Sequence, residues 1–554
     1  MPVITMDRKD LEKLTGRKLS NDILEDRLPM LGSELEKIDG NELAFEFFPN
    51  RPDLLSTEGV ARALRTFLGV KKGPAKYVLM KSNYKVVVSD ELKNIRPFIA
   101  CAVVKNIKFT DEFIKSVMQL QEKLHITHGR KRKKAAIGIY DLSKIKFPVY
   151  YSTISGSGIS FVPLDFTQEM TPSQILKEHP KGIEYSWTVS EKNKYPLLTD
   201  SRNNVLSMPP IINSDTTKVT EKTREIFIDV TGTDLKTVNQ TLNIIATAFA
   251  ERGAKLFGVK IAYPGKKTVS PEIEPVKMSL NVSYVNKVLG TAFSAKQVSE
   301  LLMKMGFGAV QKANNISVLV PCYRTDILHE FDLVEDVAIA YGYENFSPSM
   351  PVIFHPSSEE KIEIFSKKIR GIMANLGCLE VMSFILTNQE KLFSKMNQEH
   401  RQVALIENPK TSDFTVVRDT LIPCLMEVFS NNTHNELPQS IFEADDAVVL
   451  DSSADTGAKT SRKLAFARTA EKSDFTDAKS VLDTLLLSLG LNSELLSFED
   501  PSFVPGRCAL IKIKNKEIGI IGEIHPEIIL NWGFKSPVSC FEIDLDELMK
   551  LVGP

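Results

Sequence analysis

The segment from Phe331 to Tyr341 places apolar residues at the spacing of one face of an α-helix. At about 100° per residue, this face carries Phe331, Val334, Val337, Ala338 and Tyr341. The opposite face carries Asp332, Glu335 and Asp336. The pattern therefore predicts a core-facing helix whose exposed face is acidic.

The charged side chains in this part of the chain are acidic. Six carboxylates occur between Asp326 and Glu344, and no Lys or Arg lies among them. Like charges at helical spacing repel by about a few tenths of a kcal/mol per pair, so we expect a hard cation or a basic partner to compensate them. A solvated acidic surface is the alternative. Asp326 stands near the expected helix start, where a carboxylate suits free backbone N–H groups.

The patterns along the rest of the chain divide it into four expected modules of an α+β multidomain fold. Residues 1–78 combine short helices, a hairpin with its turn at residues 39–41 and a turn–helix, and form an N-terminal α/β module. Residues 84–265 mix strands with a long helix and predict an α+β module. Residues 270–347 predict a small helical module of the nucleic-acid-binding type. Residues 355–554 predict an antiparallel sheet flanked by helices.

Composition narrows the possible functions. The 554 residues include 69 Lys plus Arg and 70 Asp plus Glu, which disfavours a nonspecific polyanion binder or a membrane-surface protein. The six cysteines are scattered singly, which argues against a disulfide framework or a zinc site. Neither an apolar leader nor a membrane-spanning stretch is found, so a cytoplasmic protein with no membrane partner is expected.

One dense basic cluster interrupts this neutral chain. Five consecutive basic residues lie between a predicted helix and a predicted strand: Arg130, Lys131, Arg132, Lys133 and Lys134. Such a run is often a solvated loop, but it is also the first candidate for a phosphate contact. Phosphate-cradling loops, nucleophile elbows and zinc-protease motifs are absent from the sequence. The sequence thus contains no self-contained catalytic motif.

Five blocks together carry a resemblance to a known family: FPNRPDLLSTEGVARAL, PLLTDSRNNVLSMPPIINSDTTKV with FIDVTGTD, PCYRTDILHEFDLVEDVAIAYGYENF, VVRDTLIPCLMEV and VPGRCALIKIKNKEIGIIGEIHPEII. In this order they resemble the β subunits of phenylalanine–tRNA ligase, of the compact archaeal and eukaryotic type, with the archaeal type favoured. The blocks span nearly the whole chain.

The resemblance implies a function in a complex. The α subunit would attach Phe to tRNA(Phe) with ATP as substrate, in an α2β2 tetramer. This chain would support that reaction, help to position tRNA and hydrolyse mischarged Tyr-tRNA(Phe). Its C-terminal module would be a class II synthetase-like fold without catalytic residues for aminoacylation. A noncatalytic tRNA-binding scaffold of the same architecture is the alternative.

The resemblance also implies two sets of site residues. A Mg²⁺ site matches Asp326, Asp332, Glu335 and Asp336, and oxygen ligands suit such a hard cation. An editing pocket matches Leu198, Ser207, Asp229 and Thr231. Strand alternation places Asp229 and Thr231 on one face, although Asp229 could instead only open a turn. Relatives commonly read F-E-I-G-D-V where this chain has residues 442–447, FEADDA, so a different strand end is expected there.

Overall fold

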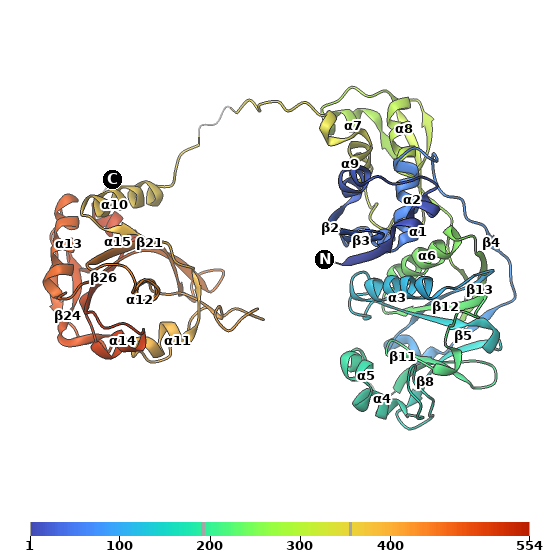
Figure 1. The fold of residues 1–554 in the computed structure, drawn as a ribbon, viewed down its shortest axis with the longest axis horizontal. Coiled ribbons are helices and arrows are strands. Elements are labelled where there is room, and N and C mark those ends of the chain that lie inside the picture. Colours follow the sequence, from blue (N-terminus) through green and yellow to red (C-terminus); the bar gives the residue numbers. More distant parts are fainter. Residues whose placement is uncertain (1, 190–193, 354–356, 553–554) are drawn as a thin grey trace. The chain divides into compact units, whose positions relative to one another are not determined.

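A computed structural model describes residues 2–189, 194–353 and 357–552 (Figure 1). The chain divides into two compact units, Met1–Ser349 and Met350–Pro554. Both units mix helices with sheets, as the predicted α+β multidomain class requires. The three modules expected before residue 348 lie within the first unit, and the fourth lies within the second. No helix in these described ranges is long and apolar enough to cross a membrane.

The N-terminal elements pack two helices on a small sheet. The elements are β1 (Val3–Asp7), α1 (Arg8–Thr15), β2 (Ser33–Asp39), β3 (Glu42–Phe47) and α2 (Thr57–Phe67). The expected hairpin is confirmed, since Asp39 pairs with Glu42 across its turn, whereas the edge strand β1 was not expected. Ser56 caps α2 by accepting a hydrogen bond from the Gly59 N–H. The segment PNRPDLLS is therefore a packed turn–helix.

A mixed sheet of eleven strands forms the centre of the first unit. Along its main path, in which each strand pairs with the next, the order is β11 (Ile212–Asn213), β10 (Val205–Met208), β9 (Lys194–Thr199), β8 (Val149–Ser155), β5 (Lys85–Val88), β13 (Lys255–Tyr263), β6 (Phe98–Lys105), β12 (Glu225–Gly232) and β7 (Ala135–Asp141). Strands β4 (Leu79–Met80) and β14 (Lys266–Ser270) lie off this path and also pair with β13. Large twisted sheets curl. Here side chains of β7 and β10, near opposite ends of the path, share a hydrogen bond.

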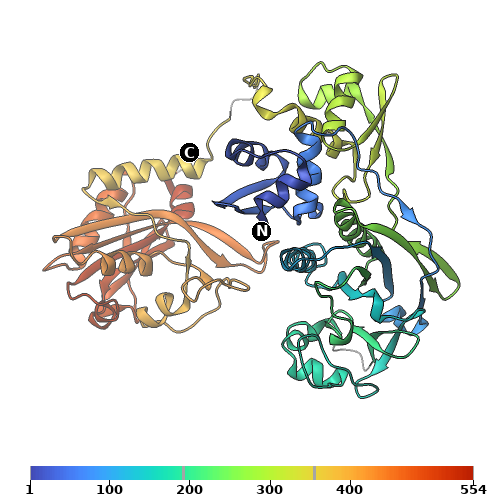
Figure 2. The same ribbon diagram turned by 45° about the vertical axis from the view of Figure 1, so that its right-hand side comes forward.

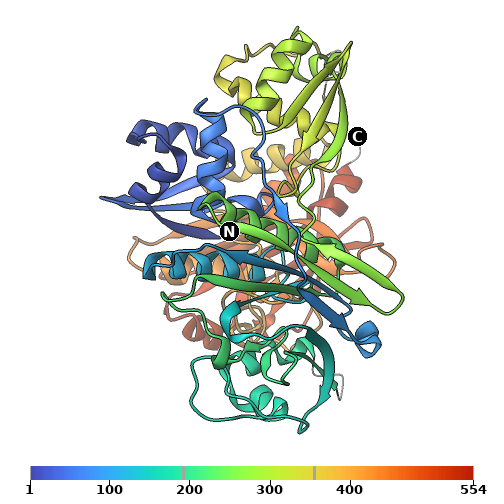
Figure 3. The same ribbon diagram turned by 90° about the vertical axis from the view of Figure 1, so that its right-hand side faces the viewer.

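Helices cover this sheet and join it to the N-terminal elements. Helices α3 (Asp111–Ile126) and α6 (Leu235–Glu251) share one apolar core with α1 and α2. An ion pair between Arg252 Nη2 and Asp10 Oδ2, at 2.6 Å, lies at the same junction. Helices α4 (Pro172–Glu178) and α5 (Pro180–Tyr185) form a small lobe at the end of the sheet away from the N-terminal elements (Figure 3). The shared core explains why these modules form one unit.

The segment before residue 348 contains more sheet than the sequence predicted. Strands β15 (Val276–Asn281), β16 (Gly308–Lys312) and β17 (Asn315–Val320) form an antiparallel sheet, covered by α7 (Val282–Leu289), α8 (Ala295–Lys304) and α9 (Glu330–Tyr341). Helix α9 confirms the predicted acidic helix. Two of its residues were assigned to the wrong face, because Phe331 is 51% exposed whereas Asp336 is only 3% exposed. Leu333 packs into the core in place of Phe331.

The second unit is a seven-stranded sheet with helices on both faces. The strand order is β18 (Leu379–Glu380), β21 (Gln439–Leu450), β22 (Ala458–Thr469), β26 (Val538–Asp544), β25 (Lys516–Ile524), β24 (Phe503–Ile513) and β23 (Glu494–Ser497), and only the β18–β21 pair is parallel. Helices α10 (Lys361–Asn375), α13 (Phe475–Ser488) and α15 (Leu545–Val552) share one core (Figure 2), and α12 (Ile422–Asn431) and α14 (Pro526–Asn531) share another. The short elements are α11 (Gln389–Leu392), β19 (Leu386–Thr387) and β20 (Val416–Val417).

The expected strand end at residues 442–447 is wrong. These residues lie in the middle of β21, which continues to Leu450. Glu443 is buried there and its Oε1 lies 2.8 Å from Nη1 of Arg418, which is itself fully buried. Asp446 pairs with Arg462 at 2.6 Å. The carboxylate that departs from the family pattern, Asp445, lies 3.1 Å from Nη2 of Arg418. Because these acidic residues have cationic partners, the strand runs on through them.

Candidate functional site

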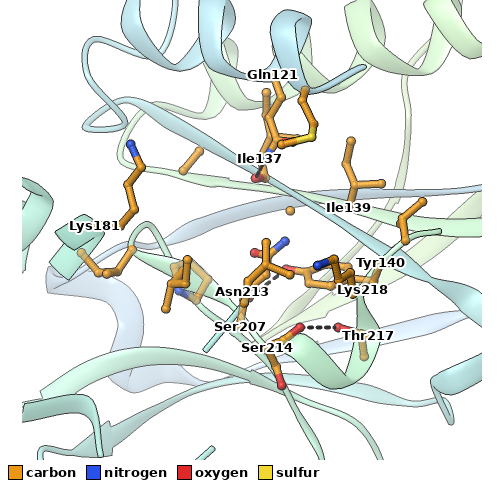
Figure 4. A pocket seen from close by; sticks show the side chains of 18 of the residues that line it. Gln121, Ile137, Ile139, Tyr140, Lys181, Ser207, Asn213, Ser214, Thr217 and Lys218 are labelled. Atoms are coloured by element: carbon orange, nitrogen blue, oxygen red, sulfur yellow. Dashed lines mark hydrogen bonds between the residues drawn. The ribbon is translucent and has the colours of Figure 1, made fainter. Parts of the chain in front are cut away.

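A cavity of about 630 Å³ lies in the first unit between α3, the edge strand β7 and the strands β10 and β11 (Figure 4). Both faces of β7 border it, because β7 is the last strand of the sheet. Ile137 and Ile139 contribute apolar surface, and Tyr140 contributes a phenolic hydroxyl. Three of the four predicted editing residues, Ser207, Asp229 and Thr231, also line the cavity.

Tyr140 connects two of these residues. Its hydroxyl lies 2.5 Å from Asp229 Oδ1 and 2.8 Å from Ser207 Oγ. An ionised carboxylate only accepts hydrogen bonds, so the phenolic proton is donated to Asp229 and Ser207 donates to Tyr140. The three side chains are each at most 2% exposed. They form a buried chain of hydrogen bonds from β10 through β7 to β12.

Burial changes the acidity of Asp229. Loss of solvent raises the pKa of this carboxyl to about 7, although the hydrogen bond from Tyr140 and the positive charge of Arg96 both act to lower it. A carboxyl group with a pKa near 7 changes its charge within the physiological range. Strongly shifted groups that line a cavity are common at functional sites.

Thr231 is held by an arginine that the sequence did not single out. Nε of Arg96 donates to Thr231 Oγ1 at 2.9 Å, and Nη2 donates to the carbonyl oxygen of Thr231 at 2.6 Å. Arg96 also donates to the backbone carbonyls of Arg132 and Lys133. Burial lowers the pKa of Arg96 to about 10, so it remains a cation at neutral pH.

The fourth predicted residue, Leu198, does not line the cavity. It is fully buried in the sheet core with Tyr151 and Leu206. Its strand β9 lies next to β10, so Leu198 supports the strand that carries Ser207. The structure thus brings Ser207, Asp229 and Thr231 together and places Leu198 behind them.

The cavity wall requires a glycine at position 138. Gly138 pairs with Asp229 across β7 and β12. A Cβ atom at this position would lie 2.0 Å from the hydroxyl of Tyr140 and 2.3 Å from Asp229 Oδ1. Any side chain there would push the two hydrogen-bonding groups out of place. Tyr140 and Gly138 were missed because buried residues in a strand pattern look like ordinary core. Arg96 was missed because an arginine just before a strand looks like an ordinary surface residue.

A histidine, His125, also lines the cavity, and one of its ring nitrogens already accepts a hydrogen bond. Nε2 of His125 accepts the Ile137 backbone N–H at 2.8 Å. Burial, the main cause, lowers the pKa of His125 to about 4, so the ring is neutral at physiological pH. Ser207 is bonded to Tyr140 and not to a basic side chain. The side chains around the cavity therefore provide hydrogen-bonding groups and, in Asp229, a carboxyl with a pKa near 7, without an activated serine.

The predicted basic run forms the turn between α3 and β7, next to this cavity. Arg130, Lys131, Lys133 and Lys134 are exposed. Arg132 is a correction, because its side chain points inward and lines the cavity. It donates to the Ile211 carbonyl at 3.0 Å and lies over the Tyr185 ring. Four cations are thus available to a polyanion, and the fifth fixes the turn to the cavity wall.

The acidic segment is compensated from within the chain. Nη2 of Arg324 lies 2.7 Å from Asp326 Oδ2 and 2.6 Å from Asp336 Oδ2. Arg51 from the N-terminal elements lies 4.0 Å from Asp326. Burial opposes ionisation of Asp326, but Arg324 and Arg51 outweigh it and hold its pKa below the ordinary range. Arg324 immediately precedes the carboxylates, so side chains of the same chain compensate Asp326 and Asp336, where a hard cation or a basic partner was expected.

The other two predicted metal ligands have different environments. Asp332 Oδ2 accepts the backbone N–H groups of Leu328 and His329, both at 2.7 Å, and so caps α9. Glu335 is exposed, but partial loss of solvent around its carboxyl, together with the nearby acidic groups, raises its pKa. Within the described residues, no three acidic, His or Cys side chains are arranged to hold a metal ion.

Comparisons with known proteins agree with this architecture. Family models match residues 86–263 (B3/4 domain), residues 278–343 (tRNA synthetase B5 domain) and residues 347–545 (phenylalanyl tRNA synthetase beta chain CLM domain). A crystal structure of an N-terminal fragment of the phenylalanyl-tRNA synthetase β subunit from Pyrococcus horikoshii is 40% identical, with a TM-score of 0.60. It covers 62% of this chain and 100% of the fragment. These domains define a component of an aminoacyl-tRNA synthetase.

Full-length relatives then give the family. The phenylalanine–tRNA ligase β subunit of Archaeoglobus fulgidus is 41% identical over 548 residues, covering 98% of both chains. Those of Pyrococcus furiosus and Methanocaldococcus jannaschii are each 42% identical and cover 99% of this chain and 100% of the relative. The chain belongs to the family of phenylalanine–tRNA ligase β subunits, as its sequence blocks indicated.

Proposed function

We propose that the cavity beside Tyr140 hydrolyses Tyr-tRNA(Phe), while the chain supports attachment of Phe to tRNA(Phe) by an α subunit. The observation that carries this proposal is the buried Asp229 carboxyl, which lines the cavity and already accepts a phenolic O–H. A tyrosyl group can offer the same donor, and a phenylalanyl group cannot. Sites built to bond a hydroxyl discriminate strongly, because the analogue leaves buried polar groups unpaired.

The chemistry we propose is attack by a positioned water on the aminoacyl ester. Ser207 is hydrogen-bonded to Tyr140, and Thr231 accepts a hydrogen bond from Arg96. Arg96 is already protonated at neutral pH and cannot take a proton from Thr231, so neither hydroxyl is activated as a nucleophile. The water adds to the ester carbonyl and the tRNA hydroxyl leaves with a proton. The pocket contributes by orienting the ester against that water.

The exposed residues of the basic run support a tRNA-binding position next to the cavity. Lys131 and Lys133 lie in the turn whose Arg132 lines the cavity. Phosphates bound at this turn would bring the end of the tRNA next to the cavity mouth. We therefore propose that the basic run and the cavity act on one tRNA molecule.

The charging reaction is proposed for the α2β2 complex. The relatives are named as β subunits, which implies an α partner, and the α subunit would bind ATP and Phe. The Mg²⁺ predicted at the acidic segment would be held by the outer carboxylates Asp332 and Glu335, because Arg324 already engages Asp326 and Asp336. Water molecules would complete the octahedral coordination that Mg²⁺ requires.

A reconstitution experiment tests the charging role. The purified chain alone should not attach Phe to tRNA(Phe), and addition of the α subunit should produce charging. Measurable aminoacylation by the chain alone, or no charging after stable assembly with α, would contradict the proposal.

A further inference from the structure

A side chain that neither the sequence nor the comparisons assign to a site lies at the centre of the cavity wall. Tyr140 is 1% exposed, and its ring stacks on Phe227 with centroids 5.9 Å apart. Its hydroxyl reaches Asp229 on β12 and Ser207 on β10, which belong to distant parts of the sheet. The ring is fixed by packing and its hydroxyl is fixed by two hydrogen bonds.

The hydrogen bonds of Tyr140 leave part of Asp229 available. Tyr140 uses Oδ1 of the carboxyl, and no hydrogen-bond partner of Oδ2 occurs within the described residues. A carboxylate has lone pairs on both oxygens and can accept from two hydroxyls at once. The protein's own phenol therefore fixes the plane of the carboxylate, and the second oxygen remains for a ligand that donates an O–H.

We propose that Tyr140 is a positioning and specificity-determining residue of this cavity: its hydroxyl, held by Ser207, orients Asp229 to accept the phenolic O–H of a tyrosyl ester. This inference rests on the proposed editing function. Two residues then recognise the substrate hydroxyl together: Asp229 contacts it, and Tyr140 orients Asp229.

Other charged and titratable groups also face Asp229. One is the cation Arg96, which attracts a negative Asp229, and the others are the buried Cys101 and Tyr151. Burial raises the pKa of both the Cys101 thiol and the Tyr151 phenol, so they remain neutral where Asp229 titrates. Arg96 stays charged there. Within the described residues, Tyr140 therefore supplies the direct hydrogen bond that favours ionised Asp229.

The test is deacylation of Tyr-tRNA(Phe) and Phe-tRNA(Phe) by the assembled complex across pH 5.5–9. In the parental complex, we expect Tyr-tRNA(Phe) deacylation to rise with pH through a midpoint near 7, as Asp229 ionises. Tyr140→Phe should move this midpoint upward by about one pH unit, because a hydrogen bond to the charged form is lost. It should also lower the preference for Tyr-tRNA(Phe) over Phe-tRNA(Phe) by about tenfold.

Tyr263→Phe is the matched control, because it removes a half-buried phenol that is hydrogen-bonded to the Ile99 backbone and lies outside the cavity. It should leave midpoint and preference unchanged. Ser207→Ala is a second variant that keeps the Tyr140 ring, and it should move both readouts in the same direction by a smaller amount.

The outcomes separate the two proposals. If the parental complex deacylates Tyr-tRNA(Phe) and Tyr140→Phe only scales the rate equally at every pH, the role of Tyr140 is refuted and the editing function stands. The same holds if Tyr140→Phe does not fold and Ser207→Ala leaves both readouts unchanged. If the parental complex leaves Tyr-tRNA(Phe) intact, the editing function is refuted, and the role of Tyr140 with it.

Discussion

Replacing Arg324 with Met should destabilise the first unit strongly. Arg324 is 7% exposed, and its guanidinium donates hydrogen bonds to both Asp326 and Asp336. Arg324→Met keeps much of the volume but removes the cation that is bonded to both carboxylates, and leaves Asp326 with the more distant Arg51. Removal of one partner from a buried ion pair costs about 3–5 kcal/mol.

The expected change in melting temperature follows from the size of the unit. Unfolding entropy is about 2.1 cal/mol/K per residue, and the first unit ends at Ser349. A loss of about 3–5 kcal/mol then lowers its transition by about 4–7 °C. Differential scanning calorimetry of the full chain measures this shift.

Arg27→Met is the matched control. Nη1 of Arg27 lies 2.9 Å from Glu344 Oε1, but the two side chains are 40% and 45% exposed. Solvent-exposed pairs contribute at most about 1 kcal/mol, so the transition should move by about 1 °C or less. Equal shifts in the two variants would refute the internal compensation. The internal compensation would also be refuted if EDTA lowered the melting temperature of the parental chain by as much as the substitution Arg324→Met does.

Three further predictions concern other parts of the chain. Changing both Asp332 and Glu335 to Ala should lower Mg²⁺ content of the assembled complex and weaken assembly, measured by metal analysis and sedimentation; unchanged values would favour a solvated acidic face. Changing both Lys131 and Lys133 to Ala should reduce the slope of log K for tRNA against log salt by about 1–2, and an unchanged slope would place the phosphates elsewhere. Because the folded-state pKa of Asp229, about 7, exceeds the ordinary 3.8, its stabilisation is present below pH 4 and lost as pH rises through 7. Asp229→Asn should therefore reduce the decline in unfolding free energy between pH 4 and 8 by about 4 kcal/mol; an equal decline in parent and variant would contradict the raised pKa.

Local features could be predicted from the sequence because they depend on near neighbours. The hairpin turn at residues 39–41 and helix α9 follow from residues a few positions apart. The exposure of Phe331 could not be predicted, because helical periodicity fits several faces and packing against the small sheet selects Leu333.

The site required tertiary information. Asp229 lies on β12, which pairs with the strand β7 that carries Tyr140, whereas Ser207 lies on β10 and reaches Tyr140 across the curled sheet. Resemblance to a family supplied these two positions, whereas Tyr140 and Arg96 lay in segments that looked like ordinary core. The partners of buried charges were equally hidden, because Arg51 reaches Asp326 from a distant module.

The measurement that tests the central claim most directly is deacylation of Tyr-tRNA(Phe) by the complex containing Asp229→Ala, with Phe charging measured in the same preparation. Asp229 lies in the cavity of the first unit, away from any aminoacylation machinery we propose. Charging with Phe should stay near the parental rate, while deacylation falls and Tyr-tRNA(Phe) accumulates. Deacylation at the parental rate would place the hydrolytic site elsewhere and favour a noncatalytic scaffold role for this chain.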